Sequence, residues 1–245
     1  MTSELTEAAV AATIDHAILK PDFTRTDVDR ELDVAAEWGV FSVCVRPSDV
    51  AYAVRRLDGT GVAVGTVIGF PHGTTSTAAK TAELRRALED GATEFDMVVH
   101  IGALRSGEDD LVTADIAAVV EAAGGRSSDG GLVTKVILET SYLDLEQIAR
   151  GSRLTEAGGA TFVKTSTGFA GGGATAEHVR LMRESVSPAV QVKASGGVRG
   201  LDSAVAMLEA GATRLGTSAS STILGELRAR AAGDTASRTE DTSSY

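Results

Sequence analysis

Short apolar runs that resemble buried strands alternate with longer stretches of helical spacing along almost the whole chain. Eight runs qualify as strands, the first of them the weakest: 13–18, 40–45, 62–69, 94–99, 132–138, 161–165, 189–193 and 213–216. Their nearly continuous apolar character is typical of parallel strands that are buried on both faces. Apolar residues recur at helical spacing in 75–90, 110–123, 175–186 and 202–210. The alternation predicts an α/β fold built from repeated βα units.

A recurring segment supports this repeat. The sequences LEDGATEF, LTEAGGATF and LEAGATRL each end a predicted helix, place a glycine after it and begin a strand with Ala-Thr. About eight βα units in 245 residues match a single closed (β/α)8 TIM barrel, with an open doubly wound sheet as the alternative. We expect one barrel domain over residues 1–232. The small, polar segment 233–245 is predicted to be a flexible C-terminal tail.

Charge and cysteine content narrow the function classes. The net charge of −11 argues against a nucleic-acid partner, because phosphate backbones would repel the chain. The single cysteine, Cys44, cannot form an internal disulfide and suits a cytoplasmic location. No targeting segment and no stretch of about 18 apolar residues is visible, so neither export nor a membrane partner is expected.

The lysines stand in unusual places. The chain has only five, and three of them, Lys135, Lys164 and Lys193, lie within predicted strands. A lysine inside a barrel must be paired, neutral or functional, because burying a lone ammonium is costly. If the face that carries Lys164 on one strand and the face that carries Lys193 on the next both point toward the barrel axis, the two lysines become neighbours near the carboxyl ends of adjacent strands. Structural ion pairs in the barrel core are the alternative reading.

Two neighbouring lysines have a chemical use. An amine attacks a carbonyl only when neutral, so its pKa must fall from about 10.4. A second ammonium at about 6 Å lowers that pKa by about two pH units at an effective dielectric of about 20, and burial acts in the same direction. We therefore predict that Lys164 is the nucleophile and Lys193 its activator. Asp96, in a third strand, is predicted to pair with a lysine and move protons. Asp15 and Lys135 are further possible members of this polar lining.

Glycine-containing loops follow the last three strands. The segments 166–173, 195–200 and 216–221 read STGFAGGG, SGGVRG and GTSASS. Backbone amides freed by glycine bind anions, and the loops after the last two strands of a barrel commonly hold phosphate. Ordinary tight turns are the alternative. The four histidines lack any close ligand spacing, so we expect no metal.

The residues in and around these strands resemble the deoxyribose-phosphate aldolase family. The matching stretches are IDHAILKP (14–21), EFDMVVHIG (94–102), TKVILET (134–140), FVKTSTGF (162–169), VKASGGVR (192–199) and RLGTSAS (214–220). They extend over nearly the whole chain. The lysine stretches are specific, whereas many barrels share phosphate loops of this kind.

The resemblance implies a homodimeric class I aldehyde-lyase that needs no metal and no cofactor. Such enzymes reversibly cleave 2-deoxy-D-ribose 5-phosphate to D-glyceraldehyde 3-phosphate and acetaldehyde through a lysine Schiff base. By position, Lys164 matches the Schiff-base lysine, Lys193 the lysine that tunes it, and Asp96 the proton-relay aspartate. The phosphate-binding positions match Gly168, Gly196, Gly197, Val198 and Ser218.

Two details depart from the family pattern or extend it. Ala219 stands where the family usually has a second serine, although its backbone amide is retained. Tyr245 ends the chain, and in some members a C-terminal tyrosine folds back into the site. Two other functions remain open: a phosphosugar isomerase or synthase without a covalent intermediate, and a non-catalytic barrel that binds a phosphorylated metabolite.

Overall fold

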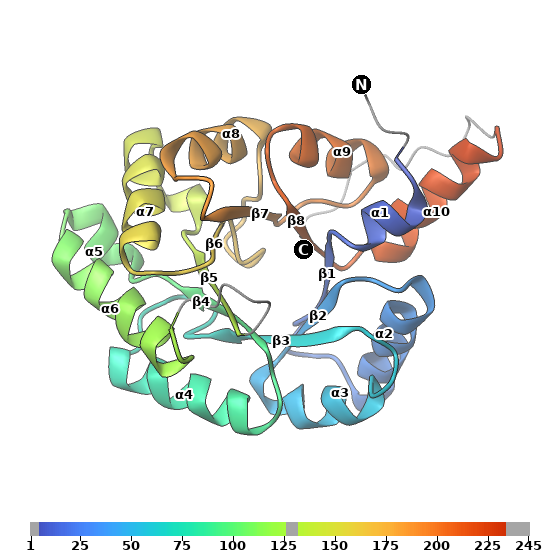
Figure 1. Ribbon diagram of the computed structural model, residues 1–245, viewed down its shortest axis with the longest axis horizontal. Helices are drawn as coiled ribbons and strands as arrows, with labels where there is room; N and C mark the ends of the chain where they lie inside the picture. Colours follow the sequence, from blue (N-terminus) through green and yellow to red (C-terminus); the bar gives the residue numbers. More distant parts are fainter. Residues whose placement is uncertain (1–4, 126–131, 234–245) are drawn as a thin grey trace.

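The predicted strands form one closed parallel barrel in the computed structural model, which describes residues 5–125 and 132–233 (Figure 1). The strands are β1 (Ile14–Ile18), β2 (Ser42–Val45), β3 (Ala63–Ile68), β4 (Glu94–Val98), β5 (Val133–Ile137), β6 (Phe162–Lys164), β7 (Gln191–Ser195) and β8 (Arg214–Thr217). Because β1 pairs with β8, the sheet has no edge. The TIM-barrel prediction is confirmed, and the open doubly wound alternative is wrong.

Helices surround the barrel (Figure 1). They are α1 (Glu7–Ala11), α2 (Arg25–Trp38), α3 (Val50–Arg56), α4 (Thr77–Glu89), α5 (Ile101–Ser106), α6 (Asp109–Ala122), α7 (Leu145–Ala157), α8 (Ala176–Ser185), α9 (Leu201–Glu209) and α10 (Ser220–Ala231). Short 3-10 turns follow β2 (Pro47–Asp49) and β5 (Thr140–Tyr142). Except for Gly233, the predicted tail lies outside the described residues, and so does Tyr245.

Local chemistry explains where the elements begin. Helix α2 starts at a reciprocal cap between Thr24 and Asp27, as expected for a threonine followed three residues later by an acid. Strand β7 begins two residues later than predicted, because the amide of Val190 donates to the carbonyl of Ser187 at 3.1 Å and closes a turn. Helix α5 was not predicted. The Nδ1 of His100 accepts from the amide of Ala103 at 3.1 Å and caps its first turn.

The apolar core lies between the barrel and its helices. Val163 and Val192 point outward from β6 and β7 and are fully buried there. The alternate residues of the same strands, Lys164 and Lys193, therefore point into the barrel. This separation leaves the interior to polar side chains. None of the helices in the described part of the chain has the length and apolar character needed to span a membrane.

Candidate active site

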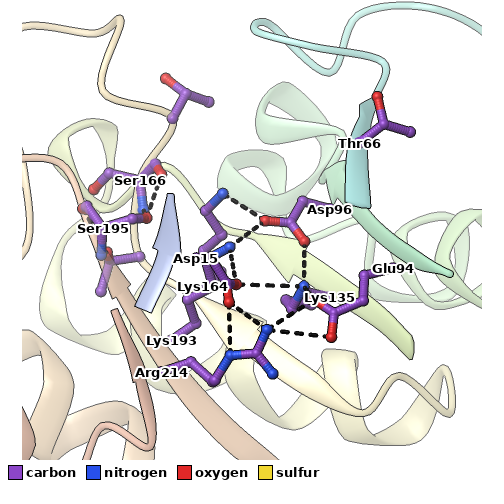
Figure 2. A network of polar contacts seen from close by, with 12 residues as sticks. Asp15, Thr66, Glu94, Asp96, Lys135, Lys164, Ser166, Lys193, Ser195 and Arg214 are labelled. Carbon is purple, nitrogen blue, oxygen red and sulfur yellow. Dashed lines mark hydrogen bonds and ion pairs between the residues drawn. The ribbon is translucent and has the colours of Figure 1, made fainter. Parts of the chain in front are cut away.

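A cluster of buried charges fills the barrel interior (Figure 2). Its seven members are Asp15 on β1, Glu94 and Asp96 on β4, Lys135 on β5, Lys164 on β6, Lys193 on β7 and Arg214 on β8. Each is buried. The parallel register brings them together, because Asp96 pairs with Lys135 and Lys193 pairs with both Lys164 and Arg214. The two predicted catalytic lysines are thus neighbours inside the barrel.

Asp96 lies at the centre of the upper part of this cluster. Its Oδ2 accepts from Lys164 Nζ and from Lys193 Nζ, both at 2.7 Å, and its Oδ1 accepts from Lys135 Nζ at 2.8 Å (Figure 2). Burial alone would raise the pKa of Asp96, but the three ammonium groups outweigh it and hold that pKa well below the ordinary value. Asp96 is therefore ionised and fixes the positions of three amines.

A second tier of charges lies beneath Asp96. Asp15 pairs with Lys193 at 2.5 Å and with the guanidinium of Arg214, while Glu94 accepts from Lys135 at 2.6 Å and from Arg214 at 2.9 Å. Burial would raise the pKa of Asp15, yet the surrounding cations lower it overall. The same contacts raise the pKa of Lys193 against the effect of burial, so Lys193 remains an ammonium.

Charge counting shows why Lys164 differs from the other cations. The cluster holds four basic side chains and only three carboxylates. Among the described residues Lys164 contacts one carboxylate, whereas Lys193 contacts two and Lys135 three. Burial lowers the pKa of Lys164, Asp96 opposes that effect, and Lys193 adds to it, for a net lowering. Of the four cations, Lys164 therefore gives up its proton most easily, and the neutral amine is the nucleophilic form of lysine.

Lys164 and Lys193 line a small cavity at the carboxyl ends of the strands. Active sites of such barrels lie at this end. Gly216 forms part of the wall, and a Cβ at that position would lie 2.8 Å from Cβ of Ser195 and 3.1 Å from Cε of Lys193. A side chain there would clash with Ser195 and press against Lys193.

The three glycine loops converge beside this cavity. Gly196 and Ser218 line it, and Gly168 and Gly197 line a second, more open cavity next to it. Gly168, Gly196 and Gly197 have φ of +87°, +85° and +76°, which the glycine residues permit. None of the five predicted phosphate-binding residues, Gly168, Gly196, Gly197, Val198 and Ser218, uses its amide as a donor to another described residue. The amides of Gly168, Gly196, Gly197 and Ser218 are therefore available to bind an anion, whereas Val198 is buried and lines neither of these two cavities.

Ala219 differs from its neighbour Ser218. Its amide donates to Thr217 Oγ1 at 2.9 Å, so this amide is already engaged within the protein. The hydroxyl of Thr217 in turn donates to the carbonyl of Val198 at 2.5 Å and ties two of the loops together. Glu139 fixes the third loop, since its carboxylate accepts from the hydroxyl of Thr167 and from its amide at 3.2 Å.

Sequence reasoning missed or misplaced several residues. Glu94 and Arg214 belong to the cluster but were not predicted. Both are charged residues within predicted strands, so the pattern that identified the lysines could have identified them as well. Cys44 also lines the cavity that holds Lys164 and Lys193, and burial raises the pKa of its thiol to about 11. His16, the neighbour of Asp15 on β1, faces the helices, where it contacts Ser220 at 2.7 Å and Glu31 at 3.1 Å. Consecutive strand residues point to opposite faces, so Asp15 and His16 could not both face inward.

Known proteins share both the sequence and the fold. The sequence profile of the DeoC/LacD family of aldolases matches residues 9–230. Deoxyribose-phosphate aldolase 2 of Staphylococcus aureus is 53% identical over 219 residues, which cover 89% of this chain and 97% of that protein. The structure of deoxyribose phosphate aldolase from Aeropyrum pernix, described as tetrameric, superposes with a TM-score of 0.83 at 30% identity, over 93% of this chain and 94% of that one. An aldolase named QR15 gives a TM-score of 0.84 at 38% identity, over 91% and 97% of the two chains.

Proposed function

Because this chain belongs to the DeoC/LacD family of aldolases, we propose that it cleaves 2-deoxy-D-ribose 5-phosphate reversibly to D-glyceraldehyde 3-phosphate and acetaldehyde. The reaction runs through an imine on Lys164. The observation that carries the mechanism is the surplus of one cation in the buried cluster, together with the single carboxylate contact of Lys164. That arrangement favours a neutral amine at the base of the cavity.

The steps follow from the carbon count of the products. The Lys164 amine attacks C1 of the open-chain sugar, and loss of water gives a protonated imine. Removal of the proton from the C3 hydroxyl lets the C2–C3 electron pair move to the iminium, which releases glyceraldehyde 3-phosphate and leaves an enamine. Protonation at C2 and hydrolysis then free acetaldehyde and the amine. Cleavage at C3–C4 would release a three-carbon aldehyde from C1 and does not fit these products.

Asp96 and Lys193 are the groups placed to move these protons. Oδ2 of Asp96 accepts a hydrogen bond from Nζ of Lys193 and one from the reacting Nζ of Lys164, each at 2.7 Å. Lys193 remains protonated and can donate, while Asp96 remains ionised and can accept. The free amides of the glycine loops hold the phosphate, which fixes C1 over Lys164 and aligns the bond that breaks.

Chemical trapping tests this function. The protein is incubated with acetaldehyde, reduced with borohydride and digested, and the peptides are examined by mass spectrometry. We expect an ethyl group on Lys164 and aldol turnover with the phosphorylated sugar. Turnover without an adduct would favour the isomerase or synthase alternative. Binding of the phosphosugar with neither adduct nor turnover would favour the non-catalytic barrel.

Substitution of Lys193 tests its electrostatic role. In Lys193→Leu the ammonium that disfavours a charge on Lys164 is gone, so the pKa of Lys164 rises. Activity increases as the amine loses its proton, so the rising limb of the pH–kcat/KM profile is expected to move upward by about two pH units. The loss of activity is then larger at neutral than at alkaline pH. An unchanged profile would contradict this role.

Other expectations stay predictions. These are the homodimer, the cytoplasmic location, the independence from metal and cofactor, and the single domain over 1–232. Tyr245 remains a candidate site residue, with a spectator tail as the alternative. Sedimentation of the purified protein tests the homodimer. The tetrameric relative from Aeropyrum pernix makes a tetramer the outcome to distinguish from a dimer.

A further inference from the structure

Lys20 lies where the two cavities meet. The inner cavity contains Lys164 and Ser218, and the outer one contains Gly168 and Gly197, so the phosphate-binding loops border both. Lys20 and Phe169 are the residues that line both cavities. Lys20 follows β1 and is exposed, and its ammonium lies 5.6 Å from the ring centroid of Phe23. A cationic side chain therefore borders both the cavity that holds Lys164 and the cavity lined by Gly168 and Gly197.

The loop that carries Lys20 is held in place from outside. The guanidinium of Arg46 donates to three carbonyls of that loop, those of Lys20 at 3.1 Å, Pro21 at 3.3 Å and Phe23 at 3.1 Å. Its Nε donates to the buried Asp49 at 2.6 Å. Three charge-assisted hydrogen bonds to one short segment fix its path. Lys20 thus extends from an anchored position rather than from a free flap.

The glycine loops alone do not supply the positive charge that would balance a bound phosphate. Their amides are neutral dipoles, whereas a sugar phosphate carries close to two negative charges and the chain itself has a net charge of −11. At the base of the inner cavity Lys193 is paired with two carboxylates, and Lys164 is the proposed nucleophile. Arg199 lines the outer cavity but already has an interaction within the protein. The ammonium of Lys20 makes no hydrogen bond or ion pair with any residue in 5–125 or 132–233 and is available.

We propose that Lys20 binds the terminal phosphate of the substrate and sets the preference for phosphorylated over unphosphorylated sugars. The inference rests on the proposed function, because it assumes that the substrate reaches from Lys164 to the glycine loops. Arg46 acts through Lys20 as a positioning residue.

Kinetics with paired substrates test the proposal. We expect Lys20→Met to raise KM for 2-deoxyribose 5-phosphate about tenfold or more, with little change in kcat, since a charge-assisted contact is lost. Its KM for unphosphorylated 2-deoxyribose should not change. Lys20→Arg should restore most of the difference, because it keeps the charge. Arg153→Met removes a cation from an exposed position on α7 and serves as the matched control with unchanged constants.

Two results would overturn the assignment: an unchanged KM for the phosphorylated sugar in Lys20→Met, or an equal rise for both sugars. A direct measurement separates this failure from failure of the proposed function. Titration of inorganic phosphate by calorimetry needs no turnover, and it should show about tenfold weaker binding to Lys20→Met than to the wild type. If the wild type neither turns over nor forms the Lys164 adduct, the proposed function fails, and the phosphate titration still decides the role of Lys20.

Discussion

Lys164→Met is expected to abolish aldol turnover, by on the order of 10⁴-fold or more, and to remove the borohydride-trapped adduct. Methionine keeps the length and apolar stem of lysine but has no nucleophilic nitrogen. Its effect on folding should be small or favourable. Three carboxylates then face three cations, and a poorly compensated buried amine is gone. The measurements are kcat/KM, mass spectrometry after reduction, and the midpoint of thermal unfolding.

Lys164→Arg is the control that separates chemistry from packing. Arginine keeps a positive charge beside Asp96 but never becomes a neutral nucleophile. We expect it to be as inactive as Lys164→Met and less stable, because the surplus charge of the cluster becomes permanent. An adduct that moves to Lys193, or activity above about one hundredth of the wild type in Lys164→Met, would show that another amine forms the imine.

The repeating pattern of the chain predicts the barrel well because each βα unit carries its own local signals. The eight runs appear as strands with ends shifted by one or two residues, and the shift at β7 comes from a turn that apolar periodicity does not register. The inward direction of Lys164 and Lys193 could also be predicted from nearby residues, because successive side chains along a strand point to opposite faces. A lysine within an otherwise apolar strand is therefore easy to recognise in the sequence.

Partners that are distant in sequence were harder to predict. Arg214 meets Asp15 and Glu94 only because the barrel closes, and one sequence cannot show which charges become neighbours across that closure. Lys80 illustrates the same limit outside the site. It lies on α4 but is fully buried, with its Nζ 2.6 Å from Asp115 and 2.9 Å from the carbonyl of Val98. The amide of Ala219 donates to the hydroxyl of Thr217, two residues earlier, and the spacing of residues in the sequence does not predict this contact.

Asp96→Asn is expected to cause the second large loss, because it removes the charge that three lysines share. Turnover should fall about 10²- to 10⁴-fold, the range for loss of a positioned acid–base group. The free energy of unfolding should fall by about 3–5 kcal/mol, since buried cations lose a partner while asparagine restores only dipoles. Both quantities can be followed on one preparation by steady-state kinetics and by urea unfolding.

The pH profile distinguishes this variant from a merely destabilised protein. Asp96 favours the charged form of Lys164, so its replacement lowers the pKa of that lysine further, and the rising limb of activity moves to lower pH. Lys193→Leu moves the same limb in the opposite direction. Asp115→Asn is the matched control, because it breaks a buried pair with Lys80 outside the cavity and should cost stability without moving the profile. Shifts of Asp96→Asn and Lys193→Leu in the same direction would mean that Lys164 does not carry the titration that governs activity.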